Sequence, residues 1–88
     1  MTEMSKKTKR VYDSIVNHIK TAREDGYEKW LGKTKDCAAM RMLYDDICSG
    51  IIYTHLDGRS LAALERRGLI RYYDDMKRDC WCVVLIED

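Results

Sequence analysis

Two cysteines one residue apart, Cys80 and Cys82, are the side chains of this chain that most directly suggest metal chemistry. Alternate residues of a strand share a face, so both thiolates could bind one ion, with Cys37, Cys48 or His55 completing the site. Structural zinc sites usually take paired ligands about two to four residues apart, and the chain has no second such pair. Cysteine also commonly fills apolar cores. We therefore expect free thiols that pack in the core, and neither a metal nor another cofactor.

Side chains that could carry out catalysis do not form a recognisable catalytic arrangement in the sequence. A cysteine nucleophile needs a neighbouring histidine and an orienting acid, and no spacing around His18 or His55 selects such a trio. The acidic pairs at positions 45–46 and 74–75 are adjacent, so the two side chains of each pair diverge. No glycine-rich phosphate loop is present. These observations favour a binding protein over an enzyme.

Basic side chains are the third group with a chemical use, because they can neutralise phosphates. The formal net charge is only +1, from 16 basic and 15 acidic residues, so a nucleic-acid interface would depend on local clustering. The basic residues cluster near the N-terminus, around a segment at 60–67 and near a turn at 74–79: Lys6, Lys7, Lys9 and Arg10; Arg59, Arg66, Arg67 and Arg71; Lys77 and Arg78.

The segment 60–67 is predicted to be a short helix, because Leu61 and Leu64 form one apolar edge beside small helix-forming alanines. Asp57 or Ser60 can cap its start, and Gly68 ends it. Strand-forming residues follow at 69–73 and 80–86, separated by the charged turn at 74–79. The expected order is therefore helix, tight stop, strand, polar turn and strand.

Upstream, two further helices and a short strand are predicted. Apolar residues with helical spacing predict a helix over 8–23, which Gly26 ends, and a second over 37–48, which Asp36 caps. Between them, Tyr27 and Trp30 lie in a predicted connector, where aromatic side chains usually cover a small core. The β-branched residues at 51–56 predict a strand or extended connector.

The junction after the third helix resembles that of the winged-helix family. The segment 61–70 matches the family pattern L-x-x-L-x-x-[KR]-G-[LI]-[IV], and Trp81 and Val83 fall on the returning strand. The match covers about a third of the chain, and the upstream helices agree only as a pattern. The resemblance implies an α+β winged helix: three helices with a small antiparallel sheet, the wing. We expect a flexible segment at 1–7 and a single winged-helix domain at 8–88.

The resemblance also implies double-stranded DNA as the partner and a role as a transcription regulator or accessory factor. The third helix would enter the major groove, with Arg59 and Ser60 nearest the bases. The other implied DNA contacts are Thr54, His55 and Arg66 around that helix, Lys77 and Arg78 on the wing, and Lys9 and Arg10 on the first helix. Arg66 has an alternative role, in which it interacts with the negative end of the helix dipole.

Winged helices also include protein-interaction modules that do not bind nucleic acid, and this alternative stays open. The aromatic residues Tyr27, Trp30, Tyr72 and Tyr73 would then form the contact surface. Both faces of the strand at 80–86 are apolar, so a homodimer is a further alternative. The sequence shows no secretory signal and no run long enough to cross a bilayer, which predicts a cytoplasmic protein without membrane contact.

Overall fold

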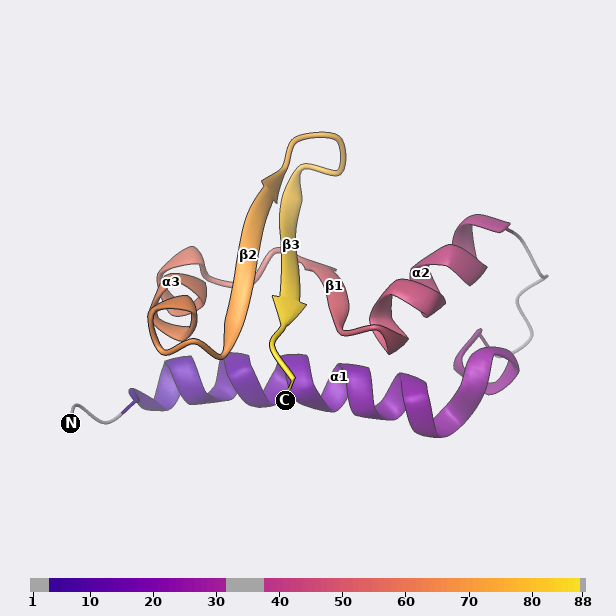
Figure 1. Cartoon of the computed structure of the whole chain (residues 1–88), viewed down its shortest axis with the longest axis horizontal. Helices are drawn as coiled ribbons and strands as arrows, with labels where there is room; N and C mark the ends of the chain where they lie inside the picture. The colour runs from indigo at the N-terminus through magenta and orange to yellow at the C-terminus, as the bar shows by residue number, and fades with distance from the viewer. Residues whose placement is uncertain (1–3, 32–37, 88) are drawn as a thin grey trace.

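The computed structural model describes residues 4–31 and 38–87 (Figure 1). These residues form three helices and a three-stranded antiparallel sheet, which confirms the expected α+β class. In chain order the elements are α1 (Lys6–Leu31), α2 (Ala38–Cys48), β1 (Ile51–Thr54), α3 (Gly58–Arg66), β2 (Ile70–Asp75) and β3 (Cys80–Leu85). This layout is compatible with a winged helix.

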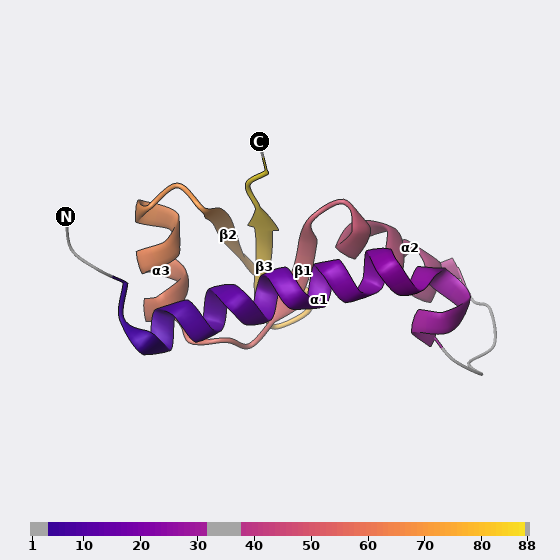
Figure 2. The ribbon, with the colours of Figure 1, turned by 90° about the horizontal axis from the view of Figure 1, so that it is seen from below.

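Helix α1 runs along the base of the molecule and carries the other elements (Figures 1 and 2). Helix α3 lies near its N-terminal end, α2 near its C-terminal end, and the sheet stands between them. None of the helices formed by residues 4–31 and 38–87 is both long enough and apolar enough to cross a membrane.

The sheet has the order β1-β3-β2, with Ile52 and Tyr72 on either side of Val83. The two strands predicted after the third helix form the β2–β3 hairpin, and the predicted short strand adds to it as β1. On β3, Trp81, Val83 and Leu85 face the core, as the alternation of the sequence indicates. The opposite face of β3 carries Cys80, Cys82 and Val84, which are half-buried.

One buried cluster joins the elements. The predicted stripe of α1 is buried and forms one cluster with residues from α2, α3 and all three strands. The cluster consists of Val11, Ile15, Ile19, Ala22, Ile47, Ile52, Leu61, Leu64, Ile70 and Val83. Burying an aliphatic side chain of this kind stabilises the fold by about 1.5–3 kcal/mol. The core therefore fixes α3 and the hairpin on α1.

The predicted ends of the first helix were wrong. Helix α1 begins at Lys6 rather than residue 8, because the Ser5 hydroxyl oxygen caps it by accepting a hydrogen bond from the Thr8 amide at 3.1 Å. At Gly26 the backbone leaves helical geometry, with φ 76° and ψ 168°, but the chain then resumes a helix to Leu31 instead of forming a connector. Gly32, Asp36 and Cys37 lie outside the described residues.

The kink at Gly26 turns the end of α1 back onto α2. The rings of Tyr27 and Trp30 lie 5.5 and 5.8 Å from the ring of Tyr44, measured between centroids. Both aromatic residues therefore pack on α2, and Trp30 also packs against the buried core, which confirms for Trp30 the prediction of a core-covering role.

Helix α3 ends as predicted, through a complete Schellman motif. Gly68 has φ 75°, its amide donates to the Glu65 carbonyl at 2.9 Å, and the Leu69 amide donates to the Leu64 carbonyl at 3.2 Å. Leu69, half-buried, packs against the same core as Leu64. This motif turns the chain sharply into β2 and so places the hairpin beside α3.

Candidate nucleic-acid interface

Helix α3 presents a basic stripe on its solvent side. Leu61 and Leu64 are fully buried on the inner side of the helix, whereas Arg59 and Arg66 are exposed. Ala62 and Ala63 lie between the two arginines, since residues three, four and seven positions apart share one helix face. We call Arg59, Ala62, Ala63 and Arg66 the α3 stripe. Its centre carries only methyl groups, so another surface can approach the helix closely.

Asp57 fixes the start of α3. Its carboxylate accepts hydrogen bonds from the Arg59 amide at 3.4 Å and from the Ser60 hydroxyl at 3.2 Å. The Lys7 ammonium of α1 lies 3.3 Å from the same carboxylate. Its hydrogen bond from Lys7, followed by those from Arg59 and Ser60, lowers the pKa of Asp57. The N-terminus of α1 is thereby held beside the N-terminus of α3.

Ser60 does not lie on the α3 stripe. Its side chain is only 3% exposed and its hydroxyl donates to Asp57, so it takes part in capping. From the sequence, Arg59 and Ser60 are both expected near the bases, because both are early positions of the helix. The apolar edge of Leu61 and Leu64 places Ser60 on the inner side, and we leave it out of the proposed interface.

The segment between β1 and α3 holds two further candidates. The Thr54 hydroxyl oxygen accepts a hydrogen bond from the Leu56 amide at 3.2 Å, which turns the chain out of the sheet. This turn ends β1 at Thr54, two residues earlier than predicted. His55 lies at the turn and is exposed. Both residues therefore precede α3 closely, as expected, but only His55 has an exposed side chain.

At the hairpin, Asp75 holds the turn that joins β2 to β3. Its carboxylate accepts hydrogen bonds from the Lys77 and Arg78 amides at 3.1 and 3.2 Å, and from the Arg78 guanidinium at 2.7 Å. The hydrogen bond from the Arg78 side chain is the largest cause of the lowered pKa of Asp75. The Lys77 side chain is exposed.

Arg78 is folded back onto the sheet. Its guanidinium carbon lies 4.2 Å from the centroid of the Tyr53 ring, a cation–π contact, and the Tyr53 hydroxyl donates to the Asp46 carboxylate of α2 at 3.1 Å. The sequence could not indicate this contact, because it joins the hairpin turn to β1. An Arg78 contact with DNA would have to replace it.

Lys9 and Arg10 are exposed on α1. The ion pair of Lys7 with Asp57 places this part of α1 beside α3 (Figure 1). In the sequence, Lys7 belongs to the N-terminal basic cluster, and nothing there indicates its contact with Asp57. Its role depends on how two helices pack, for which the sequence carries no local pattern.

Glu65 is the acidic residue nearest the stripe in the sequence of α3. Its carboxylate accepts a hydrogen bond from the Tyr72 amide at 3.3 Å. Tyr72 lies on the edge strand β2, so Glu65 covers a backbone group that would otherwise face solvent.

The aromatic residues of the alternative interface do not form one surface. Tyr27 and Trp30 pack on α2, and the Tyr72 ring contacts the Trp81 ring at 5.3 Å between centroids. Tyr73, 54% exposed, faces the other side of the sheet from Tyr72. The four rings are therefore spread over separate parts of the fold.

Cys48, Cys80 and Cys82 are free thiols, as expected, and Cys37 lies outside the described residues. Cys48 packs against the core, but Cys80 and Cys82 lie half-buried on the opposite face of the sheet, so the prediction that cysteines fill the core is wrong for these two. Burial raises the pKa of the Cys82 thiol. Within residues 4–31 and 38–87, no three histidine, cysteine or acidic side chains gather as a metal site would require.

Comparison with models of protein families, with curated proteins and with solved structures finds no match to this chain.

Proposed function

We propose that this protein binds double-stranded DNA by placing α3 in the major groove, and that it acts as a transcription regulator or accessory factor rather than an enzyme. The α3 stripe carries this proposal. It combines two exposed arginines with small side chains between them on a helix that the core holds firmly.

The spacing of the stripe suits a groove. Arg59 and Arg66 are seven residues apart, which corresponds to about 10.5 Å along a helix axis. The major groove is about 12 Å wide, which admits one helix, so the two arginines would lie one behind the other along the groove. Arginine can bind guanine edges or phosphates with two parallel hydrogen bonds. In this arrangement the alanines face the base edges, and the arginines at the two ends reach bases or backbone.

Groups beside α3 would contact phosphates. His55 precedes the helix, and Lys9 and Arg10 lie on the part of α1 that Lys7 joins to α3. Lys77 extends from the hairpin turn. Because the net charge of the chain is only +1, affinity would come from these local groups and not from the overall field.

The first experiment measures binding of a random-sequence DNA duplex by fluorescence anisotropy at several salt concentrations. For about four or five phosphate contacts we expect log Kobs to fall with log salt with a slope of about −3 to −5. The variant Arg59→Ala/Arg66→Ala should bind at least about tenfold more weakly and show a shallower slope.

The matched control is Lys20→Ala/Lys29→Ala, which removes two positive charges from exposed positions on the remainder of α1. It should bind nearly as well as the wild type. Equal losses in both double variants would mean that only total charge matters, and no binding at low salt would exclude the proposal.

A protein-interaction module is the second candidate, favoured by two apolar side chains on the hairpin. Tyr73 is 54% exposed and Met76 is 83% exposed. Sedimentation equilibrium of the wild type and of Tyr73→Ser/Met76→Ser tests the homodimer form of this candidate. Self-association that the double variant abolishes would support it, and identical monomeric behaviour of both proteins would count against it.

A further inference from the structure

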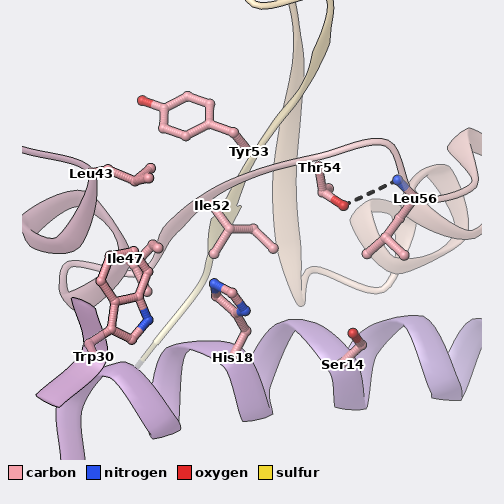
Figure 3. A pocket seen from close by; sticks show the side chains of 9 residues that line it. All are labelled: Ser14, His18, Trp30, Leu43, Ile47, Ile52, Tyr53, Thr54 and Leu56. Carbon is pink, nitrogen blue, oxygen red and sulfur yellow. Dashed lines mark hydrogen bonds between the residues drawn. The ribbon is translucent and has the colours of Figure 1, made fainter. Parts of the chain in front are cut away.

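A pocket of about 320 Å³ lies between α1 and β1, on the side of the molecule where α2 and the turn before α3 close its two ends (Figure 3). It is separate from the α3 stripe, and none of the stripe residues lines it. Its walls come from four parts of the chain: α1, α2, β1 and the turn before α3.

The floor of the pocket is apolar and held in place. Ile47 and Ile52 belong to the buried core, and Trp30, Leu43 and Leu56 pack against that core. A site whose apolar wall is already fixed loses little conformational freedom when a ligand binds. Pockets that bind small molecules measure about 300–1,000 Å³, so this pocket suits a ligand with one or two rings.

Hydrogen-bonding groups stand on two opposite walls. Ser14 and His18 are one turn apart on α1, and their side chains rise toward β1 (Figure 3). On the other wall the Thr54 oxygen already accepts from the Leu56 amide, so its hydroxyl hydrogen can donate to a ligand. The Tyr53 hydroxyl donates to Asp46 and is already engaged.

None of the described residues that line the pocket has an acidic side chain, so a bound anion meets no like charge from them. The polar groups of the pocket offer hydrogens from two hydroxyls and an imidazole. Hydrogen bonds that a carboxylate accepts are stronger than those that a neutral oxygen accepts. The arrangement favours a ligand that presents a carboxylate beside a flat apolar body.

We propose that this pocket binds a small aromatic carboxylate. The ring lies against Ile52 between Trp30 and Leu56, and the carboxylate accepts hydrogen bonds from Ser14, His18 and Thr54. The wall at Thr54 to Leu56 leads directly into Asp57, the cap of α3, so an occupied pocket adjoins the start of that helix. Ligand binding itself does not depend on the proposed DNA binding.

The test uses 1-naphthoate and its uncharged counterpart 1-naphthalenemethanol as probes, titrated into the full chain without DNA and followed by amide and methyl NMR shifts. We expect shifts that centre on residues 14–18 and 52–56 and on the Trp30 indole, and a Kd about tenfold lower for the carboxylate. Shifts spread over the whole core, or equal Kd values for the two probes, would overturn the proposal.

Ser14→Trp should fill the pocket from an exposed position of α1 and weaken naphthoate binding at least tenfold. The matched control is Asn17→Trp, which adds the same side chain to an exposed position of α1 that does not line the pocket. Equal affinity in the two variants would place the ligand elsewhere.

His18→Leu provides a second measurement should Ser14→Trp fold poorly. It should reduce the preference for naphthoate over the alcohol, because the hydrogen bond that it removes is stronger to a carboxylate than to a neutral oxygen. An unaltered preference would remove His18 from the site and contradict the proposed recognition of the carboxylate.

Discussion

Asp57 is a single residue on which the geometry of the candidate interface depends, because its carboxylate contacts α3 twice and α1 once. Asp57→Ala removes the helix cap and the ion pair with Lys7 together. We expect the melting temperature to fall by about 4–8 °C, the usual effect of a lost N-cap in a domain of this size. Circular dichroism during heating measures the change.

Asp57→Asn is the matched control, because asparagine keeps the capping oxygen and loses only the charge. It should recover most of the melting temperature. If Asp57→Ala melts within about 1 °C of the wild type, the carboxylate does not stabilise α3 as described.

Glu65 offers a residue-scale test of where DNA lies. Glu65→Gln keeps a side-chain oxygen that can accept from the Tyr72 amide, but it removes a negative charge from α3. If the α3 stripe faces DNA, affinity should rise by about two- to fivefold with little change in melting temperature, since repulsion of the phosphates is relieved. Anisotropy titrations at low salt would measure this.

The corresponding control for Glu65 is Glu28→Gln, which removes the same charge from an exposed position in the last turns of α1, beyond the kink. It should leave affinity nearly unchanged. An equal rise in both variants would indicate an effect of total charge, and no rise in Glu65→Gln would place the DNA away from α3.

At the scale of elements, the kink of α1 depends on Gly26. Its φ of 76° and ψ of 168° lie in a region that residues with a Cβ atom rarely adopt, although no atom lies within 4 Å of where that Cβ would be. Gly26→Ala should therefore destabilise the domain by about 1–3 kcal/mol through backbone strain alone. Urea unfolding gives the free energy.

The variant Gly68→Asn is an informative comparison for Gly26→Ala. Gly68 also has a positive φ, 75°, and open space around it, but it ends a helix where asparagine is tolerated. Gly68→Asn should therefore lower the free energy of unfolding less than Gly26→Ala does. A Gly26→Ala protein as stable as the wild type, with Trp30 fluorescence unchanged, would show that the kink is not strained.

The elements that the sequence predicts correctly are those with a local cause. The periodic stripe of α1, the alternation of β3 and the stop at Gly68 each follow from residues that are neighbours in the chain. The helix after Gly26 was missed because its stability comes from packing of Tyr27 and Trp30 on Tyr44, which is distant in sequence. The start at Lys6 was missed, although Ser5 offers a capping oxygen.

In the candidate site, too, the sequence predicts features with a local cause and misses those that depend on packing between elements. The positions of Arg59 and Arg66 on one exposed face follow from helical spacing, and the exposure of Lys77 follows from the turn. The ion pair of Lys7, the contact of Arg78 with Tyr53 and the pocket beside His18 each join separate elements. Such contacts depend on how helices and strands pack, and no pattern in this single sequence encodes them.

At the scale of the whole molecule, three carboxylates hold the periphery of the fold together. Asp57 joins α1 to α3 and Asp75 closes the hairpin turn. Glu87, after β3, accepts two hydrogen bonds from the Arg23 guanidinium at 2.7 and 2.9 Å, while Arg23 also donates to the Cys48 carbonyl at 2.8 Å. The hydrogen bond from Arg23 is the largest cause of the lowered pKa of Glu87.

Each of these carboxylates has a pKa in the folded protein below its ordinary value of 3.8 or 4.5, so the unfolded chain binds more protons than the folded one as the pH falls. The stabilisation is fully present above the ordinary pKa values and is lost as the pH falls through the lower values of the folded state. We therefore expect the urea midpoint to be steady from about pH 7 to 5 and to decrease once the pH is lower than about 4.5.

Glu87→Gln should lose less stability in acid than the wild type, because glutamine does not titrate. The control is Glu24→Gln, which replaces a carboxylate that lies 4.0 Å from the Lys20 ammonium, and it should follow the wild type. If the stability of Glu87→Gln falls as steeply in acid as that of the wild type, the hydrogen bonds between Arg23 and Glu87 contribute nothing to the stability of the whole fold.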